Sequence, residues 1–332
     1  MQSSHANKCS INGSSMDIAE KQYRLLQLCA IRVEQQSVDW GVIARQAQDL
    51  AGLDELWQGI VHEESAGAKR SVPILRKGLR DPVPLAQRVD AELEAAAAVG
   101  AHLVTVMDGG YPANLRLIPN LPPFLFYRGE LREEDAWSVA VVGTRQPSDP
   151  GIDQAALVSR LLAERGVTVI SGLARGIDTA AHRAALTASG RTIAVLGTGI
   201  TRCYPAENRN LAEDITGSGA LVSQFWPTRP PGKDTFPRRN VVTSGISQGT
   251  VVIEASSTSG AKMQARLAIE HGKKVFLVRS LVTSQPWASN YVRRRGAIEV
   301  ATVDEVITRL AAPERVRKAT EQRQTQLTLS LL

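Results

Sequence analysis

The sequence predicts an α/β protein with a doubly wound, mostly parallel, Rossmann-like sheet. Three short apolar runs, Val139–Val142, Val167–Ile170 and Thr192–Leu196, are rich in β-branched residues. Continuous rather than alternating apolar strands are typical of parallel sheets that helices cover on both faces. Each run ends in a turn of small residues, and segments of helical length separate the runs. Strand, helix and strand at this spacing indicate right-handed crossovers.

The region before the sheet is predicted to hold three short segments. Residues 1–17 are polar and rich in Ser and Asn, which predicts a disordered N-terminal segment. Residues 18–62 carry apolar side chains at mixed spacings of three and four, so we expect a small helical module. Residues 63–84 are rich in Ser, Gly, Lys and Pro and are expected to form a linker.

Two further strands are expected to extend the sheet on its N-terminal side. An alanine-rich helix is predicted from Leu85 to Val99, with Gly100 as its stop. Strands are then predicted at Leu103–Met107 and Phe124–Tyr127, before the first core strand.

From residue 152 onward, strands and helices are predicted to alternate. The expected elements are helix 152–165, strand 167–171, helix 177–189, strand 192–196, helix 207–216, strand 220–223, a basic loop at 226–240, helix 240–247, strand 250–254, helix 260–271 and strand 274–278. An extended Rossmann-like domain would therefore span 85–312. A charged, Gln/Thr-rich tail would follow over 313–332.

Composition excludes several classes of protein. Of the 332 residues, 43% are hydrophobic and 22% charged, which is ordinary for a soluble globular chain. No apolar run approaches the roughly 20 residues that cross a bilayer, and no secretory signal is recognisable, so we expect a cytoplasmic protein with no membrane contact. Cys9, Cys29 and Cys203 form no CxxC pair. We therefore expect no disulfide framework, no metal and no cofactor.

The charge distribution predicts a polyanionic partner. The net charge is +6, and residues 136–313 carry 21 Lys and Arg against 13 Asp and Glu. The positive excess therefore belongs to the predicted α/β region, where it would attract a nucleic acid.

Two of the strand-end turns are candidates for binding phosphate, because carboxyl ends of parallel strands converge on one crevice. In Gly143-Thr144-Arg145, backbone N–H groups would cradle a phosphate and Arg145 would add a bidentate donor. The alternative is that the glycine serves turn geometry alone. The second turn contains Gly172, Arg175 and Gly176 but no Walker lysine, which disfavours an ATPase. Asp178 after it is expected to cap the following helix, which leaves Arg175 as the functional candidate.

The segment from Lys233 to Asn240 is the most distinctive. It places Lys233, Arg238 and Arg239 around a single aromatic residue, Phe236. Cations that follow a backbone beside a ring that stacks on an unpaired base are typical of single-strand binding. The alternative is a solvated basic loop with Phe236 in the core.

No catalytic set can be assembled from the sequence. Glu254 ends a buried strand before a hydroxyl-rich turn, so it would act either as a general base or as an acceptor for backbone N–H groups and an arginine. His182 is the histidine nearest the crevice, and no GxSxG elbow is present. We therefore predict no catalytic residue and expect a protein that is not an enzyme.

Several ordered motifs resemble the DNA-processing protein A (DprA/Smf) family. The resemblance covers roughly residues 85–312. It is carried by Gly143-Thr144-Arg145, Val169–His182, Thr192–Gly199, Cys203–Asn208, Phe236–Asn240 and Ile253–Gly260, and upstream by Tyr111-Pro112 and Pro122–Gly129. The chain departs from the family in lacking a helix-hairpin-helix glycine signature, in the segment 279–295, and in having no evident C-terminal winged helix.

The resemblance implies a homodimeric protein that binds and protects single-stranded DNA and helps load the RecA recombinase in natural transformation. Gly143, Thr144 and Arg145 would form a phosphate pocket with Arg175 beside it, and Lys233, Phe236, Arg238 and Arg239 would grip the strand. Two alternatives stay open. One is a nucleotide-binding or nucleoside-monophosphate-processing enzyme with Glu254 as base, and the other is a nucleotide-sensing module of a defence system.

Overall fold

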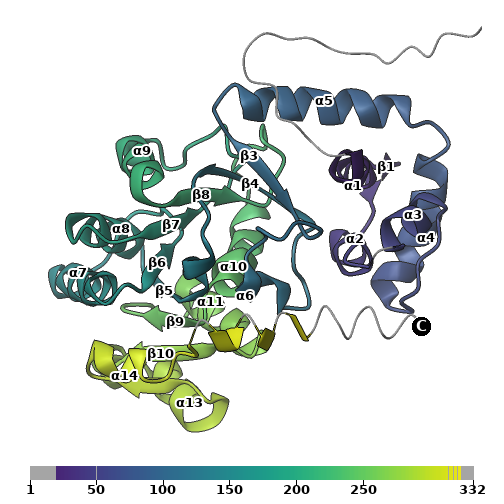
Figure 1. Cartoon of the computed structure of the whole chain (residues 1–332). Coiled ribbons are helices and arrows are strands. Elements are labelled where there is room, and N and C mark those ends of the chain that lie inside the picture. Colours follow the sequence, from purple (N-terminus) through teal and green to yellow (C-terminus); the bar gives the residue numbers. More distant parts are fainter. Residues whose placement is uncertain (1–19, 50, 313, 317, 320, 323–332) are drawn as a thin grey trace, which may run out of the picture.

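A nine-stranded sheet lies at the centre of the protein (Figure 1). The computed structural model describes residues 20–49, 51–312, 314–316, 318–319 and 321–322. The strand order is β11-β10-β9-β5-β6-β7-β8-β4-β3. The strands are β3 (His102–Thr105), β4 (Phe124–Gly129), β5 (Ser138–Val142), β6 (Thr168–Ser171), β7 (Thr192–Val195), β8 (Ala220–Ser223), β9 (Gly249–Val252), β10 (Lys274–Val278) and β11 (Ile298–Val300).

The predicted fold class is confirmed. All pairs from β8 through β11 are parallel, whereas β4 pairs with β8, and β3 with β4, in antiparallel fashion. Every residue of strands β5 to β9 is buried. The β-branched runs are thus covered on both faces, and the two N-terminal strands extend the sheet as expected.

The winding of the chain reverses between β5 and β9, which are neighbours in the sheet. Helices α7 (Asp149–Glu164), α8 (Ile177–Thr187) and α9 (Arg209–Ser218) cover one face, and α10 (Thr235–Ile246) and α11 (Gly260–Glu270) cover the other (Figure 1). Loops that leave β5 and β9 therefore diverge. In open α/β sheets, such a reversal leaves a crevice outside the carboxyl ends of the two strands.

The N-terminal module consists of short helices and one small hairpin. It comprises α1 (Glu20–Ala30), the hairpin β1 (Arg32–Val33) and β2 (Gln36–Ser37), α2 (Trp40–Gln46) and α3 (Gly52–Trp57). The predicted helices are present, but the hairpin interrupts them. Glu34 and Gln35 form its turn with positive φ angles of 52° and 66°.

The prediction of a linker over 63–84 was wrong, because most of it is helix α4 (Ala66–Gly78). The Ser65 side chain caps this helix by accepting from the Ala68 N–H at 3.1 Å. Ala68, Ser71 and Leu75 are buried at helical spacing, which the Ser, Gly and Pro content of the segment concealed. The next helix, α5 (Val83–Ala97), matches the predicted one and packs on α1.

The predicted basic loop over 226–240 was also wrong in its second half, because α10 begins at Thr235 rather than near 240. Pro237 lies in the first turn of the helix, where an N–H has no partner inside the helix in any case, so the proline is tolerated. Phe236, Arg238 and Arg239 therefore project from a helix in different directions.

The remaining elements were not assigned from the sequence or are short. They are α6 (Ala113–Arg116), η1 (Glu133–Ala136), η2 (Ala206–Asn208), α12 (Arg279–Ser284), α13 (Pro286–Arg295) and α14 (Val303–Ile307). The predicted disordered segment 1–17 lies outside the described residues, and those described between 314 and 322 are helical. None of the described helices is long and apolar enough to cross a bilayer.

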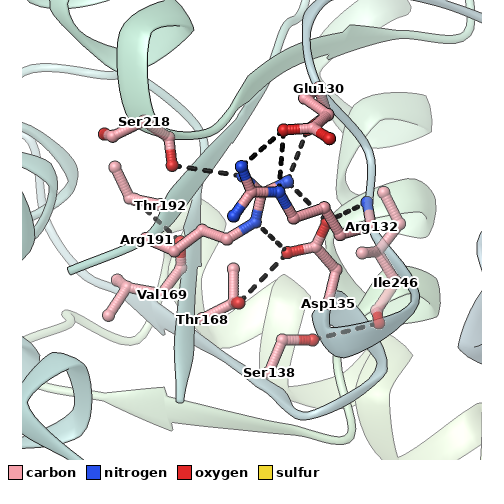
Figure 2. Close-up of polar contacts among 10 residues, drawn as sticks. All are labelled: Glu130, Arg132, Asp135, Ser138, Thr168, Val169, Arg191, Thr192, Ser218 and Ile246. Carbon is pink, nitrogen blue, oxygen red and sulfur yellow. Dashed lines mark hydrogen bonds and ion pairs between the residues drawn. The ribbon is translucent and has the colours of Figure 1, made fainter. Parts of the chain in front are cut away.

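A buried ion pair closes the amino end of the sheet, opposite the crevice (Figure 2). Arg191 donates from Nε and Nη2 to the two carboxylate oxygens of Asp135, at 2.6 and 2.8 Å. The two side chains are 14% and 8% exposed. Asp135 also accepts from the Thr168 hydroxyl at 3.1 Å, and Arg191 donates to the carbonyls of Glu130 and Ser218. The pair therefore joins the segments that precede β5, β7 and β8 to the first residue of β6.

Replacing one partner should destabilise the protein strongly, because it leaves the other charge buried and unpaired. We expect Asp135→Asn to lower the free energy of unfolding by about 3 kcal/mol. Urea unfolding measures this. Glu164→Gln is the matched control, because it removes an exposed i,i+4 partner of Arg160 and should cost less than about 1 kcal/mol. Equal losses in the two variants would contradict the assignment.

Candidate functional site

A cavity of about 330 Å³ lies in the crevice at the carboxyl ends of β5 and β9. The turn after β5, the turn after β6, one face of α10 and the start of α11 line it. Of the predicted site residues, the cavity brings together Gly143, Thr144, Arg145, Gly172, Phe236, Arg239 and Asn240. Arg175, Gly176, Lys233, Arg238 and Glu254 do not line it.

The turn after β5 is held rigidly. A Cβ atom on Gly143 would lie 2.4 Å from a side-chain carbon of Ile177, so the turn passes too close to α8 for any other residue. The Thr144 N–H donates to the Glu254 carbonyl at 2.7 Å, and the Thr144 carbonyl accepts from the Ile177 N–H at 3.3 Å. Both predicted roles of Gly143 are therefore compatible with the structure. The close approach to α8 requires a glycine, and the turn that contains it lines the cavity.

Arg145, Phe236 and Tyr204 form a cluster at the mouth of the cavity, in which Arg145 and Phe236 line the cavity and the Tyr204 ring is tilted by 49° against that of Phe236. The Arg145 guanidinium lies 5.2 Å from the centre of the Phe236 ring, within cation–π range. The Tyr204 ring is 5.7 Å from that of Phe236, and Tyr204 is 47% exposed. A Cβ atom on Gly197 would lie 2.7 Å from the Phe236 ring, so the backbone there supports the ring from below. Phe236 is half-buried, and its ring is not lost in the core.

Tyr204 is a candidate that the sequence analysis did not place in the site. The sequence offered one signal, an aromatic residue followed by Pro205 in a turn after a core strand. That signal does not show that the ring meets Phe236, 32 positions away.

Arg239 lies buried beneath the crevice and lines the floor of the cavity, rather than projecting from an exposed basic loop. Its side chain donates from Nη1 to the carbonyls of Gly172 and Val195, at 2.5 and 3.0 Å, and from Nε to the Asn240 side chain at 3.0 Å. Arg239 is 8% exposed, and burial lowers its pKa. Nε and Nη1 are therefore engaged, whereas Nη2 forms no hydrogen bond among the described residues, and the positive charge under the cavity floor favours an anion above it.

Asp178 holds the second turn from below rather than capping the helix as predicted. Its carboxylate accepts from the N–H groups of Gly172 and Ala174 at 3.1 and 3.3 Å, and the N-cap position of α8 is Gly176. Burial raises the pKa of Asp178, and the nearby charge of Arg239 opposes that shift. Asp178 therefore fixes the backbone that carries the cavity wall.

Arg175 lies outside the cavity in an exposed ion pair. Its Nε and Nη2 donate to the two carboxylate oxygens of Glu207, both at 2.8 Å. Gly176 beside it has a φ of +73°, and a Cβ atom there would lie 2.6 Å from the Thr144 carbonyl oxygen. The glycine thus permits close packing of the first two turns.

Lys233 and Arg238 do not continue the crevice as one strip. Lys233 is exposed ahead of α10. Arg238 lies on the other side of that helix, with its guanidinium 5.3 Å from the Trp40 ring centre and 5.1 Å from that of Phe225.

Glu254 acts as an acceptor, as in the second of its two predicted roles, but no arginine among the described residues pairs with it. Its carboxylate accepts from the Ser148 N–H at 3.1 Å and from the Ser148 hydroxyl at 2.8 Å. Ser148 in turn caps α7 by accepting from the Gly151 N–H at 3.2 Å. These contacts occupy the carboxylate in holding the start of a helix, which disfavours Glu254 as a general base.

His182 does not face the crevice. Its ring is fully buried in α8, with Nδ1 2.7 Å from the Thr192 hydroxyl, and its Nε2 has no hydrogen-bond partner among the described residues. In the part of the chain that the structure describes, no group of three or more His, Cys, Asp or Glu side chains is arranged to hold a metal ion.

A protein-family comparison decides the family. The model of the family described as DNA recombination-mediator protein A matches residues 102–311. The chain belongs to the DNA recombination-mediator protein A family. The match includes both antiparallel strands and the whole doubly wound part of the sheet.

Named relatives of this family agree. Protein Smf of Escherichia coli K12 is 40% identical over 212 residues, which are 63% of this chain and 56% of that protein. DNA processing protein DprA of Bacillus subtilis is 30% identical over 262 residues, covering 75% of this chain and 87% of that protein. The chain spans between 47% and 61% of the length of three such relatives, among them the E. coli protein.

Two solved structures of DNA processing protein A share this fold. That from Streptococcus pneumoniae superimposes with a TM-score of 0.67 at 29% identity, covering 90% of this chain and all of that one. That from Helicobacter pylori, described for its single-stranded DNA binding mode, has a TM-score of 0.56 at 24% identity and covers 62% of this chain and 94% of that one. The second likeness shows the fold.

Substituting Gly172 should disturb the cavity floor. A Cβ atom there would lie 1.7 Å from Nη1 of Arg239, so Gly172→Ala would push the guanidinium off its carbonyl acceptors. We expect a loss of about 2 kcal/mol in the free energy of unfolding. Urea unfolding beside Gly217→Ala, where a Cβ atom meets nothing within 4 Å, provides the comparison. A loss no greater than that of the control would show that Arg239 is not fixed by this contact.

The buried ring of His182 should make stability depend on pH. Burial, with the charge of Arg239, lowers its pKa from 6.5 to about 3. Below its ordinary pKa the unfolded chain takes up a proton that the folded protein does not. The free energy of unfolding should therefore fall by up to about 1.4 kcal/mol per pH unit from pH 6.5 downward.

His182→Asn removes this titration while keeping a donor near Nδ1. Urea unfolding between pH 7 and pH 5, in about half-unit steps, compares the two slopes. His271, whose pKa burial also lowers, contributes equally to both proteins. Parallel slopes would contradict the assignment.

Proposed function

We propose that this protein binds single-stranded DNA in the crevice and carries out no chemistry on it. The observation that supports this most directly is the group at the cavity mouth, where an exposed arginine and two aromatic rings lie together. Arg145 supplies a donor for a phosphate, and Phe236 and Tyr204 supply faces for unpaired bases. Stacking on an aromatic side chain contributes about 1–3 kcal/mol per base and accepts any base.

The cavity itself suits one phosphate group. The rigid turn at Gly143 and Thr144 faces it, and the buried charge of Arg239 lies beneath it. Among the described residues Arg145 forms no ion pair with a carboxylate, so a phosphate would not have to displace an internal partner. Binding of this kind depends strongly on salt and weakly on sequence.

The family supports the wider role that we propose. Its relatives are named as DNA processing proteins, and the H. pylori protein is described as binding single-stranded DNA. We infer a cytoplasmic homodimer that protects incoming DNA and assists the loading of RecA recombinase during natural transformation. Membership of the family is what supports the proposed contacts with RecA and with a second copy of the chain.

A nucleotide enzyme is the second candidate. The cavity volume falls within the range of small-molecule pockets, about 300–1,000 Å³, which favours a mononucleotide. The occupied carboxylate of Glu254 argues against hydrolysis there, since a general base needs a free acceptor near the reacting group.

Removing the exposed guanidinium of Arg145 should weaken DNA binding without affecting the fold. We expect Arg145→Ala to raise the Kd for a fluorescent oligothymidine at least about tenfold, because one charge-assisted contact and its stacking on Phe236 are lost. The slope of log Kd against log salt concentration should fall by about one, as expected for the loss of one phosphate contact. Fluorescence anisotropy at several salt concentrations measures both.

Arg183→Ala is the matched control, because Arg183 is an exposed arginine on α8 that does not line this cavity. Its affinity should equal that of the wild type. If Arg145→Ala and Arg183→Ala bind alike, the crevice is not the DNA site. Tight binding of nucleoside monophosphates, with release of free base and no binding of the oligonucleotide, would instead support the enzyme.

A further inference from the structure

A second and larger cavity, of about 530 Å³, lies between the helical module and the α/β domain. Its walls come from the hairpin strand β1, the start of α2, the loop after β8 and one face of α10. Four arginines line it, namely Arg32, Arg45, Arg229 and Arg238, against two aspartates, Asp39 and Asp234.

Helix α10 is the partition between this cavity and the crevice. Phe236, Asn240 and Thr243 line the crevice, whereas Asp234, Arg238 and Val241 line the second cavity. Each set recurs at spacings of three and four, so each occupies one face of the helix. An α-helix with its side chains is about 10 Å across, so the two cavities lie about one helix diameter apart on opposite sides of α10.

Two of the four arginines are paired with carboxylates of the described residues, and two are not. Arg45 is paired with Glu63 at 2.8 Å, and Arg229 with Asp234 at 2.9 Å. Within the described residues, neither Arg32 nor Arg238 forms an ion pair with a carboxylate. Arg238 is held in place by the Trp40 and Phe225 rings, and Arg32 is exposed. Arg238 on the Trp40 and Phe225 rings therefore repeats the arrangement of Arg145 on the Phe236 ring at the mouth of the crevice.

The walls of the second cavity are held together by packing between the two parts of the chain. The Trp40 ring lies 5.0 Å from Phe124 and 6.2 Å from Trp226, centre to centre, and its Nε1 donates to the Cys29 carbonyl at 3.1 Å. Arg45 also donates to the Pro119 carbonyl at 2.8 Å. The cavity is therefore formed in advance, which reduces the entropy lost when a ligand binds.

We propose that one single strand occupies both cavities, crossing the first turn of α10 and placing backbone phosphates against Arg238 and Arg32. This inference rests on the proposed function and extends it to a second subsite. Lys233 lines neither cavity but is exposed two residues ahead of α10, close in sequence to the turn that the strand would cross. A short oligonucleotide would fill the crevice, and a longer one would fill both cavities.

The test uses Arg32→Ala in the full chain, with oligothymidines of about 4 and about 15 nucleotides. For the longer strand we expect Kd to rise about tenfold. The slope of log Kd against log salt concentration should fall by about one, because one phosphate contact is lost. For the shorter strand both should match the wild type. Arg70→Ala is the control, because Arg70 is an exposed arginine of α4 that lines neither cavity.

Tryptophan emission provides a second measurement. The longer strand should quench part of the wild-type emission and the shorter strand should not, and the difference should become smaller in Trp40→Phe, in which Trp226 is the remaining tryptophan of the cavity lining. Unchanged binding of the longer strand by Arg32→Ala, or equal weakening of both lengths, would overturn the second subsite while leaving the crevice as the DNA site. If the wild type bound neither length, the proposed function itself would fail, and this subsite with it.

Discussion

The buried guanidinium of Arg239 is the contact on which the crevice depends. It ties α10 to the carboxyl ends of β6 and β7 through the carbonyls of Gly172 and Val195. Helix α10 is also the crossover that carries the chain from β8 back to β9 beside β5. A buried charge is costly unless hydrogen bonds satisfy it. Few other placements of α10 against the sheet would keep the Arg239 guanidinium hydrogen-bonded. Fixing α10 in this way sets the separation of the two cavities.

The sheet could be predicted from sequence because its signal is local. Runs such as Val139–Val142 are β-branched and continuous, which requires burial on both faces whatever lies around them. The turns at Gly143 and Gly172 could likewise be recognised as tight. What crowds them, Ile177 in one case and Arg239 in the other, depends on tertiary packing.

The site was less predictable because it depends on the phase of one helix. Neighbouring residues on a helix are about 100° apart, so Arg238 and Arg239 separate as soon as α10 begins at Thr235. Read as a loop, the same residues suggest a single basic strip. The pairing of Arg175 with Glu207, and of Phe236 with Tyr204, joins positions 32 apart in each case, and no periodicity reports such contacts.

Helix α5 touches both parts of the chain, and this bears on how the protein can be divided. Tyr23 of α1 donates to Asp90 at 2.7 Å, and the hydroxyl and N–H of Thr228 donate to Glu92 at 2.8 and 2.9 Å. Cutting the chain ahead of α5 would strip the apolar face containing Leu85 and Val89 of its partners. We therefore expect the helical module and the sheet to unfold as one cooperative unit, so that amide hydrogens of α1 and of β4 would exchange with solvent through the same opening.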